Sequence, residues 1–387
     1  MLFALLLAPI SLVFEGDGVS ANYLFLFMLL LAPRGYRVNP VAFAYLGFCL
    51  IAWAIGVVIF SQGDAGFIVR QAISAMLWSA CILLLLVRIP FTIEEVCAAA
   101  VLAGTVYSVY VVWTVVSHGI PITDVYFIKG DLRNFVPDWP QRYVVVLMFA
   151  FFVAMERSRR GVIWMLSALA ILACIFLTFT RAAWIGVVAG LLGYLWLSRT
   201  VGGGQPREPM RWSTRITRSL IAVGVVVFVA TSEVVLKAFM IIYDHFALVT
   251  AVLFSGDGFD AQGSVGTRLE IWRHIQELVE RSPLTGTGFA GADLLIEGTG
   301  SAHSQYMDIL LRTGLVGMAF FVFFWAKLLI VYARRSPGMV GGLLAIAVFG
   351  FFQESIKLSY GALLFFVLLN KAYEFEHLDD VVARSGS

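Results

Sequence analysis

Charged side chains are scarce in this sequence. Asp, Glu, Lys and Arg make up 13% of the 387 residues and hydrophobic residues 60%, whereas soluble domains carry about 25% charged and about 45–50% apolar residues. A soluble chain of this length would need two or three domains with polar surfaces. The 27 basic and 25 acidic side chains cannot cover such surfaces. The composition therefore excludes soluble, fibrous and disordered classes and indicates a membrane protein.

Cysteine is also rare, and metal-ligand patterns are missing. The five histidines show no metal-ligand spacing, H-E-x-x-H is absent, and Asp257 and Asp260 are scattered carboxylates rather than a catalytic pair. We therefore expect no metal, no cofactor and neither metalloprotease nor glycosidase chemistry. A thiol inside an apolar run usually packs as a small hydrophobic group, so no disulfide is expected. The cysteines in such runs are Cys49, Cys81, Cys97 and Cys174.

The sequence has no repeat of fixed period and no basic patch interleaved with exposed aromatic residues. Nucleic acid is therefore not an expected partner. The apolar residues 1–14 lack both a basic n-region and an A-x-A cleavage site, which a secretory signal peptide would carry. We expect these residues to remain as a membrane helix.

Long apolar windows fill most of the chain. A spanning helix needs about 20 mostly apolar residues, and dividing the chain at Pro, Gly and charge clusters predicts an all-α polytopic membrane protein with about 12 transmembrane helices. Counts of ten or eleven stay possible because several windows are short. The predicted spans are 2–14, 19–32, 41–60, 67–87, 96–116, 143–155, 162–180, 182–197, 219–231, 307–332, 339–352 and 358–373.

Basic residues collect in alternate connectors of this pattern. Cytoplasmic loops carry the excess of Lys and Arg, so we expect both termini in the cytoplasm and the sparsely basic connectors outside. The residues that set this orientation are Arg34, Arg37, Arg88, Arg157, Arg159, Arg160, the stretch 199–218, Arg334 and Arg335.

Two larger connectors, 117–142 and 232–306, then face outward. Only the second is long enough for a small folded subdomain. We therefore predict nine transmembrane helices in 1–231, an outer loop subdomain in 232–306, and three helices with a cytoplasmic tail in 307–387. Function is expected at the outer face.

Arg181 departs from the positive-inside pattern. It lies between two apolar windows with almost no loop, at or just below the outer membrane surface. An arginine at such depth costs about 2.5–3.5 kcal/mol unless it has a partner or a wet cavity, so we expect a bound anion to offset this cost. The alternative is a snorkelling arginine that anchors the helix end to a lipid phosphate.

Arg268 lies in a predicted amphipathic helix over 267–282. Thr267 and Glu270 have the spacing of a capping box, and Pro283 ends the pattern. We expect the helix to lie on the membrane, with Arg268 in its first turn beside free backbone N–H groups that favour a phosphate. The apolar residues at helical spacing are Leu269, Trp272, Ile275 and Val279.

The segment 286–291 reads GTGFAG, a literal G-x-G-x-x-G. The dinucleotide fingerprint requires a strand before it and a helix after it, whereas an amphipathic helix precedes this copy. We interpret it as a flexible loop that lets backbone approach a ligand or fold over a cavity, and not as a nucleotide site.

His303 stands in a polar turn before the long apolar window 307–332, at the outer mouth of the membrane domain. Its unperturbed pKa of about 6.5 suits it to take a proton near neutral pH. The alternative is a helix cap or another satisfied polar group. Asp308 and Arg312, four residues apart, are expected to pair.

Three stretches together resemble the O-antigen ligase and polymerase superfamily of bacterial envelope glycan transferases. Their order, spacing and topology are similar to that family, and together they cover about half of the chain. They read LTFTRAAWIG at 177–186, GTRLEIW at 266–272 with PLTGTG at 283–288, and AHSQY at 302–306 with GLVG at 314–317.

The resemblance implies a metal-independent glycosyltransferase of the bacterial inner membrane that uses no nucleotide. Such an enzyme takes a glycan from undecaprenyl diphosphate on the periplasmic face and joins it to an acceptor hydroxyl. By position, Arg181 and Arg268 would hold the diphosphate and His303 would act as general base. Many members carry a serine where Thr180 stands, which leaves the subfamily open. Secondary candidates are Arg142, Arg273, Gln305 and Tyr306.

Several functions stay open at this point. The preferred one is a ligase that passes a polysaccharide to a lipid A-core acceptor, and the main alternative is a polymerase that extends the next lipid-linked repeat. A protein-glycosylating relative is a third variant. A flippase of the lipid-linked glycan would need polar residues at midplane depth and interrupted helices, and the sequence indicates neither.

Overall fold

The computed structural model describes residues 35–119, 136, 143–178, 180–200, 264–296, 299–354 and 359–385. Within these ranges the chain is helical and contains no strand, only one isolated bridge between Tyr36 and Val87. The helices are α3 (Pro40–Phe60), α4 (Ala65–Leu83), the 3-10 helix η1 (Leu84–Leu86), α5 (Ile93–Ser117), α7 (Val144–Arg157), α8 (Val162–Leu177), α9 (Arg181–Thr200), α12 (Ser264–Arg281), α13 (Ala292–Leu295), α14 (Gln305–Ala333), α15 (Pro337–Gly350) and α16 (Ser359–Ser385).

Five of the described helical segments are long and apolar enough to cross a membrane: α3, α4 with η1, α5, α9 and α14. The helices α8 and α15 are apolar but shorter, and α7 and α16 also fall on predicted windows. The predicted spans 2–14, 19–32 and 219–231 lie outside the described residues, as do much of 117–142 and the first part of 232–306. The total of about 12 spans therefore stays a prediction.

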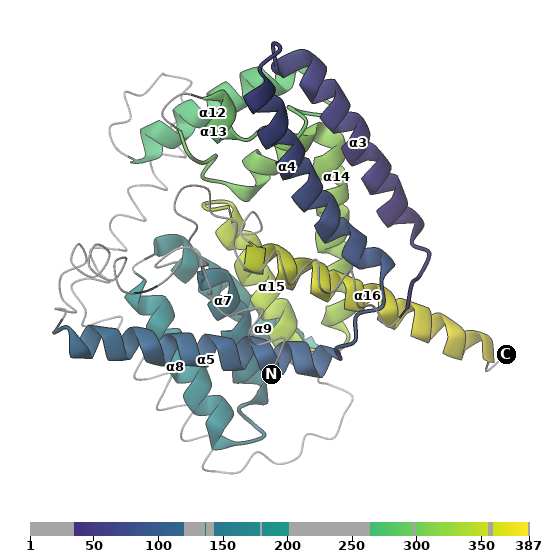
Figure 1. Ribbon diagram of the computed structural model, residues 1–387. Helices are drawn as coiled ribbons and strands as arrows, with labels where there is room; N and C mark the ends of the chain where they lie inside the picture. Colours follow the sequence, from purple (N-terminus) through teal and green to yellow (C-terminus); the bar gives the residue numbers. More distant parts are fainter. Residues whose placement is uncertain are drawn as a thin grey trace.

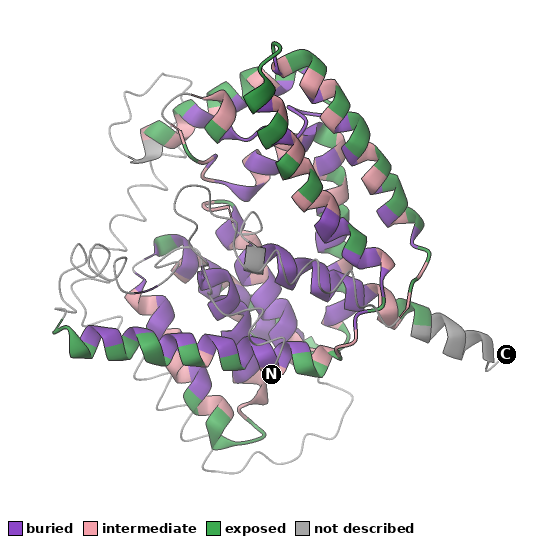
Figure 2. Ribbon diagram, viewed as in Figure 1, coloured by how far each residue is buried: buried purple, intermediate pink, exposed green. Residues whose placement is uncertain are grey.

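The helices form two packed groups (Figure 1). α3, α4 and α14 run side by side, with α12 and α13 near one end of them, while α5, α7, α8, α9 and α15 pack together below. α14 joins the groups because it contacts both α15 and α16. Figure 2 shows α7 and α15 almost wholly buried and α3 largely exposed. A helix that is apolar all round belongs in a core, and the exposed apolar side of α3 is a surface suited to lipid.

Small residues bring α9 and α15 into backbone contact. A Cβ added at Gly186 would clash with the carbonyl of Ala345, and one at Gly190 with the carbonyl of Gly341. This confirms the close helix packing that a small-xxx-small spacing predicts. The two contacts also show that α9 and α15 are antiparallel, so the start of α9 lies beside the C-terminal end of α15.

Polar contacts join the helix ends away from the start of α9. Arg37 Nε donates to the carbonyl of Leu85 over 2.7 Å, Arg157 pairs with Glu94, and Glu156 Oε2 accepts the N–H of Gly338 over 3.0 Å. Arg37, just before α3, and Arg157, the last residue of α7, both belong to the predicted cytoplasmic clusters. All four cysteines are buried, as their apolar windows predict.

The amphipathic helix α12 is confirmed, with two corrections. It begins at Ser264, so Thr267 does not start it and Arg268 lies beyond its first turn. The capping-box spacing was misleading because helical backbone already precedes it. A capping box does form where Thr92 starts α5. The apolar face of α12 was expected to rest on the membrane, but it packs on α14 and α13.

The helix α14 is interrupted at Gly314, whose φ is +62°. The prediction that no helix is interrupted was therefore wrong. The loop 283–289 fills the break: Leu315 N–H donates to Pro283 O over 2.9 Å, and Thr287 N–H donates to Leu311 O over 2.7 Å. These long-range backbone bonds satisfy groups that the helix itself leaves unpaired.

The glycine motif 286–291 lies in this loop. No strand precedes it, as expected, since α12 runs directly into the loop. The loop is not a flexible cover, because residues 285–292 are buried. Gly286 has φ +61° and Gly288 φ +67°, and side chains there would clash with the backbone of α14 and of α3. The glycines therefore let the loop backbone approach the protein's own helices α14 and α3, and not a ligand.

Candidate functional site at the meeting of α9, α12 and α14

Arg181 is the first residue of α9, and its side chain is exposed. The preceding turn is fixed by two buried threonines: Thr180 N–H donates to Thr178 Oγ1, and Thr180 Oγ1 donates to Thr178 O, each over 3.2 Å. A serine offers the same hydroxyl, so the departure at Thr180 leaves this turn intact. Free N–H groups at a helix start attract anions, and Arg181 adds a guanidinium to them.

Arg268 lies half-buried on α12. Burial lowers the pKa of its guanidinium, and the positive charge of Arg181 lowers this pKa further. The fold therefore places two cations within electrostatic reach of each other. Neither has a carboxylate partner among the residues that the structure describes. A nearby anion would relieve the repulsion between these two like charges, so the pair is a candidate anion site.

His303 lies in the turn before α14 and is half-buried. Its φ is +52°, a left-handed conformation that is uncommon for residues other than glycine. The N-cap of α14 is Ser304, whose side chain accepts the N–H of Met307, so His303 does not cap this helix. Strained backbone of this kind persists only where surrounding contacts hold it, and it often marks a functional site.

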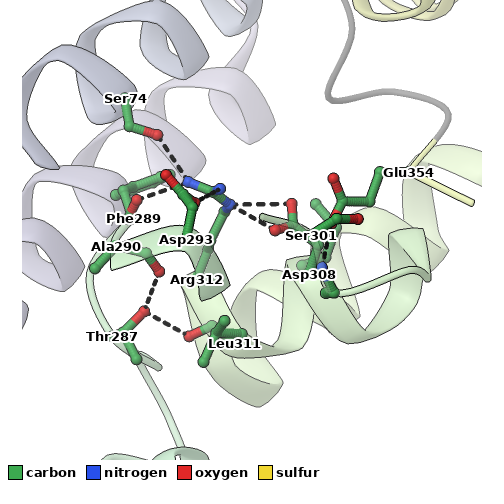
Figure 3. Close-up of polar contacts among 12 residues, drawn as sticks. Ser74, Thr287, Phe289, Ala290, Asp293, Ser301, Asp308, Leu311, Arg312 and Glu354 are labelled. Atoms are coloured by element: carbon green, nitrogen blue, oxygen red, sulfur yellow. Dashed lines mark hydrogen bonds and ion pairs between the residues drawn. The ribbon is translucent and has the colours of Figure 1, made fainter. Parts of the chain in front are cut away.

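Contacts from two other elements hold the turn at Ala302, the residue before His303. Trp272 Nε1 of α12 donates to Ala302 O over 2.9 Å. On the other side, Glu354 Oε1 accepts the N–H of Ala302 over 2.6 Å, and Figure 3 shows Glu354 close to this segment. Within the turn, His303 N–H donates to Ser301 Oγ over 3.0 Å.

These contacts link the elements that carry the three predicted site residues. Arg268 and Trp272 are one turn apart on α12 and share a face, and Trp272 reaches the residue next to His303. Ser304 Oγ meets Gly350 O, at the end of α15, over 3.5 Å. The antiparallel packing of α9 on α15 places the start of α9, and so Arg181, beside that same end. A series of contacts thus links the elements of Arg181 and Arg268 to the turn that carries His303.

Arg312 does not contribute to this cluster. As predicted, it pairs with Asp308, with Nε 2.8 Å from Oδ1 and 3.0 Å from Oδ2. Its Nη1 also donates to Ser74 Oγ over 2.9 Å and to Phe289 O over 2.8 Å. Figure 3 shows Arg312 between these partners. The buried charge is compensated, and its role is to fasten the loop 283–289 and α4 to α14.

The contacts of Arg273 and Tyr306, two of the four secondary candidates, are made outside this cluster. Arg142 lies outside the described residues. Arg273 is exposed and lies 3.7 Å from Glu277 on the solvated side of α12. The hydroxyl of Tyr306 donates to Ala347 O over 2.9 Å, which is a packing contact. Gln305 is buried as the first residue of α14.

Sequence reasoning missed Glu354 and the polar role of Trp272. Trp272 was predicted only as part of an apolar stripe, although its indole N–H needs a hydrogen-bond partner when the ring packs inside. Glu354 lies just after the apolar window 339–352, at the end predicted to face outward, and a lone carboxylate there was the available signal. Among the described residues, no group of three His, Cys, Asp or Glu could hold a metal ion.

Comparison with known proteins identifies the family. No curated protein matches the chain significantly. The family model described as O-Antigen ligase matches residues 166–322, a range that runs from α8 to α14 and contains Arg181, Arg268 and His303. With its apolar helices, this match makes the chain a multi-pass membrane protein with a function of the ligase and polymerase type. Residues 166–322 of this chain thus match the O-antigen ligase family.

Proposed function

We propose that this protein is an O-antigen ligase-like glycosyltransferase of the bacterial inner membrane. It moves a polysaccharide from undecaprenyl diphosphate to a hydroxyl of a lipid A-core acceptor on the periplasmic face, without a metal ion. The observation that carries the proposal is that Arg181, from α9, lies near enough to Arg268, from α12, for its charge to lower the pKa of Arg268. A bound diphosphate would relieve this repulsion.

The two arginines hold the diphosphate of the donor. Each guanidinium can donate two parallel hydrogen bonds to phosphate oxygens. As the bond between the sugar's anomeric carbon and the diphosphate oxygen breaks, negative charge grows on that oxygen. Fixed positive charge at this place stabilises the transition state more than the ground state. Arg181 and Arg268 therefore stabilise the leaving group, as a metal ion does in other reactions that release a phosphate or diphosphate.

His303 is the general base on the acceptor. Its neutral imidazole takes the proton of the acceptor hydroxyl while the hydroxyl oxygen bonds to the anomeric carbon. The diphosphate leaves with the electron pair of the broken bond, and the imidazolium later gives its proton to solvent. The left-handed turn at His303 supports this role, since strained backbone is enriched at functional sites.

A polymerase is the main alternative, because it needs the same donor site and the same base. Acceptor choice then depends on connectors such as 117–142, most of which lies outside the described residues. A flippase is favoured by one feature, the interruption of α14 at Gly314. However, the loop 283–289 already hydrogen-bonds several backbone groups at this break, whereas a transporter uses such groups to coordinate its cargo.

Transfer by the purified protein tests the proposal. The protein is reconstituted in lipid vesicles with an undecaprenyl-diphosphate-linked polysaccharide, a lipid A-core acceptor and EDTA. We expect polysaccharide attached to lipid A-core, and loss of this product in Arg181→Ala and Arg268→Ala. Arg273→Ala is the matched control, because this exposed arginine lies on the same helix as Arg268. Longer chains on the lipid carrier alone would indicate a polymerase, and glycan translocation without transfer a flippase.

A further inference from the structure

The turn that carries His303 is held from outside by one carboxylate. Ala302 is fully buried, and its N–H donates to Glu354 Oε1 over 2.6 Å. Glu354 comes from the segment after α15, far along the chain from the turn. A hydrogen bond from a backbone N–H to an ionised carboxylate is stronger than one to a neutral acceptor. This contact is therefore a major anchor of the turn.

We propose that Glu354 is a positioning residue for His303: its carboxylate holds the N–H of Ala302 and so fixes the left-handed turn that aims the imidazole. This proposal deepens the proposed function and rests on it for the role of His303. Glu354 does not itself touch the reacting atoms in this account. It acts through the backbone of the residue that precedes the base.

The energetics of the turn make such an anchor necessary. The φ of +52° at His303 is unfavourable, and strain of this kind persists only when neighbouring contacts over-determine the backbone. The peptide groups around Ala302 receive one contact from α12, through Trp272, and one from beyond α15, through Glu354. Without Glu354 a buried N–H would lose its partner, and the turn could relax about its contact with Trp272.

The place of Glu354 in the chain relates the turn at His303 to the position of Arg181. It directly follows α15, and the end of α15 lies beside the start of α9, where Arg181 is placed. Ser304 also meets that end at Gly350. The donor-binding arginine and the turn of the base are thus fixed to the same element, so Glu354 sets the position of the imidazole relative to the donor diphosphate.

Two substitutions separate an anchoring role from a role in proton transfer. Glu354→Gln keeps a side-chain oxygen that can accept the Ala302 N–H, whereas Glu354→Leu removes it at similar size. We expect Glu354→Leu to lower kcat by roughly 100-fold, because small misplacements of a catalytic group have effects of this order, with the donor KM nearly unchanged. Glu354→Gln should retain kcat within about tenfold of the native protein.

Amide hydrogen exchange gives a readout that does not depend on activity. In Glu354→Leu we expect faster exchange of the peptide covering 299–307, and near-native exchange in Glu354→Gln. Glu156→Leu is the matched control: Glu156 also accepts a backbone N–H, that of Gly338 at the other end of α15. Its loss should leave exchange in 299–307 unchanged.

The outcomes distinguish the two proposals. If Glu354→Leu keeps native kcat and native exchange while His303→Ala is inactive, the positioning role is wrong and the proposed function stands. If Glu354→Gln is as inactive as Glu354→Leu at equal protein level, Glu354 acts through its charge or proton, and the positioning role is again wrong. If His303→Ala transfers glycan normally, the proposed base is wrong, whatever the exchange data show about the anchor.

Discussion

Arg181 lies close enough to Arg268 for its charge to lower the pKa of the Arg268 guanidinium. The two residues belong to α9 and α12, which the chain separates by the long segment 201–263. Without a bound anion, this approach of two cations opposes folding. With a diphosphate between them, the same approach becomes favourable.

Arg181→Lys should fail nearly as badly as Arg181→Ala, with transfer reduced on the order of 10²–10³-fold. Lysine keeps the charge but loses the planar group that meets two phosphate oxygens. The measurement is transfer rate per inserted protein in the vesicle assay. Arg273→Lys serves as the control and should stay active. Native activity in Arg181→Lys would favour an arginine that only anchors the helix end to lipid.

Arg268→Ala should weaken binding of a short polyprenyl diphosphate much more than binding of the corresponding monophosphate. The second arginine is needed only when a second phosphate group is present, and each charge-assisted contact contributes about 1.5–3 kcal/mol. Titration of both lipids into the detergent-solubilised protein measures this difference. Equal losses for the two lipids would place Arg268 outside the diphosphate site.

His303→Asn should be inserted, bind the donor and lack transfer, with kcat reduced by about 10²–10⁴-fold. Asparagine tolerates a left-handed backbone well, so the turn is kept while the proton acceptor is lost. Ser304 still caps α14 in this variant. Donor titration and transfer assays on the same preparation provide the check. Near-native transfer would exclude His303 as the general base.

Gly288→Ala should destabilise the protein more than Gly63→Ala. Both glycines have positive φ, so each alanine carries a backbone cost of about 1–2 kcal/mol. Only at Gly288 does the new Cβ also meet backbone, that of Ala52, whereas Gly63 faces open space. Overpacking adds about 1–3 kcal/mol. Thermal unfolding in detergent measures the difference, and equal midpoints would contradict the packed state of the loop 283–289.

Cysteine reporters should reveal the two sides of the membrane. Gly161 and Gly300 are exposed, and a Cβ at either meets nothing nearby. Gly300→Cys should react with an impermeant thiol reagent applied outside the inner membrane, and Gly161→Cys should not. The native cysteines are buried and give little background. Reaction at Gly161 alone would reverse the predicted orientation.

Local patterns predicted much of the fold. The apolar windows that fall on described residues coincide with helices, the pair Asp308 and Arg312 follows from helical spacing, and the close packing of α9 on α15 follows from Gly186 and Gly190. Each of these features depends on residues within a turn or two of one another. The periodicity of a helix is enough to place them.

Features that depend on distant backbone were missed. The break at Gly314 is stabilised by bonds from the loop 283–289, and no pattern within 307–332 indicates them. The capping-box spacing at Thr267 is a local signal that cannot tell whether helix already precedes it. Glu354 meets Ala302 only because α15 and α14 pack together, so its part in the site could not be predicted from residue spacing.

The break in α14 also makes this helix depend on an earlier segment of the chain. The carbonyls of Pro283 and Leu284, which accept the N–H groups of Leu315 and Val316 after the break, belong to a segment that the ribosome makes before α14. A membrane helix with unpaired N–H groups in lipid is costly. These N–H groups find their partners only when the loop 283–289 is packed against α14, so a stable α14 and a packed loop depend on each other.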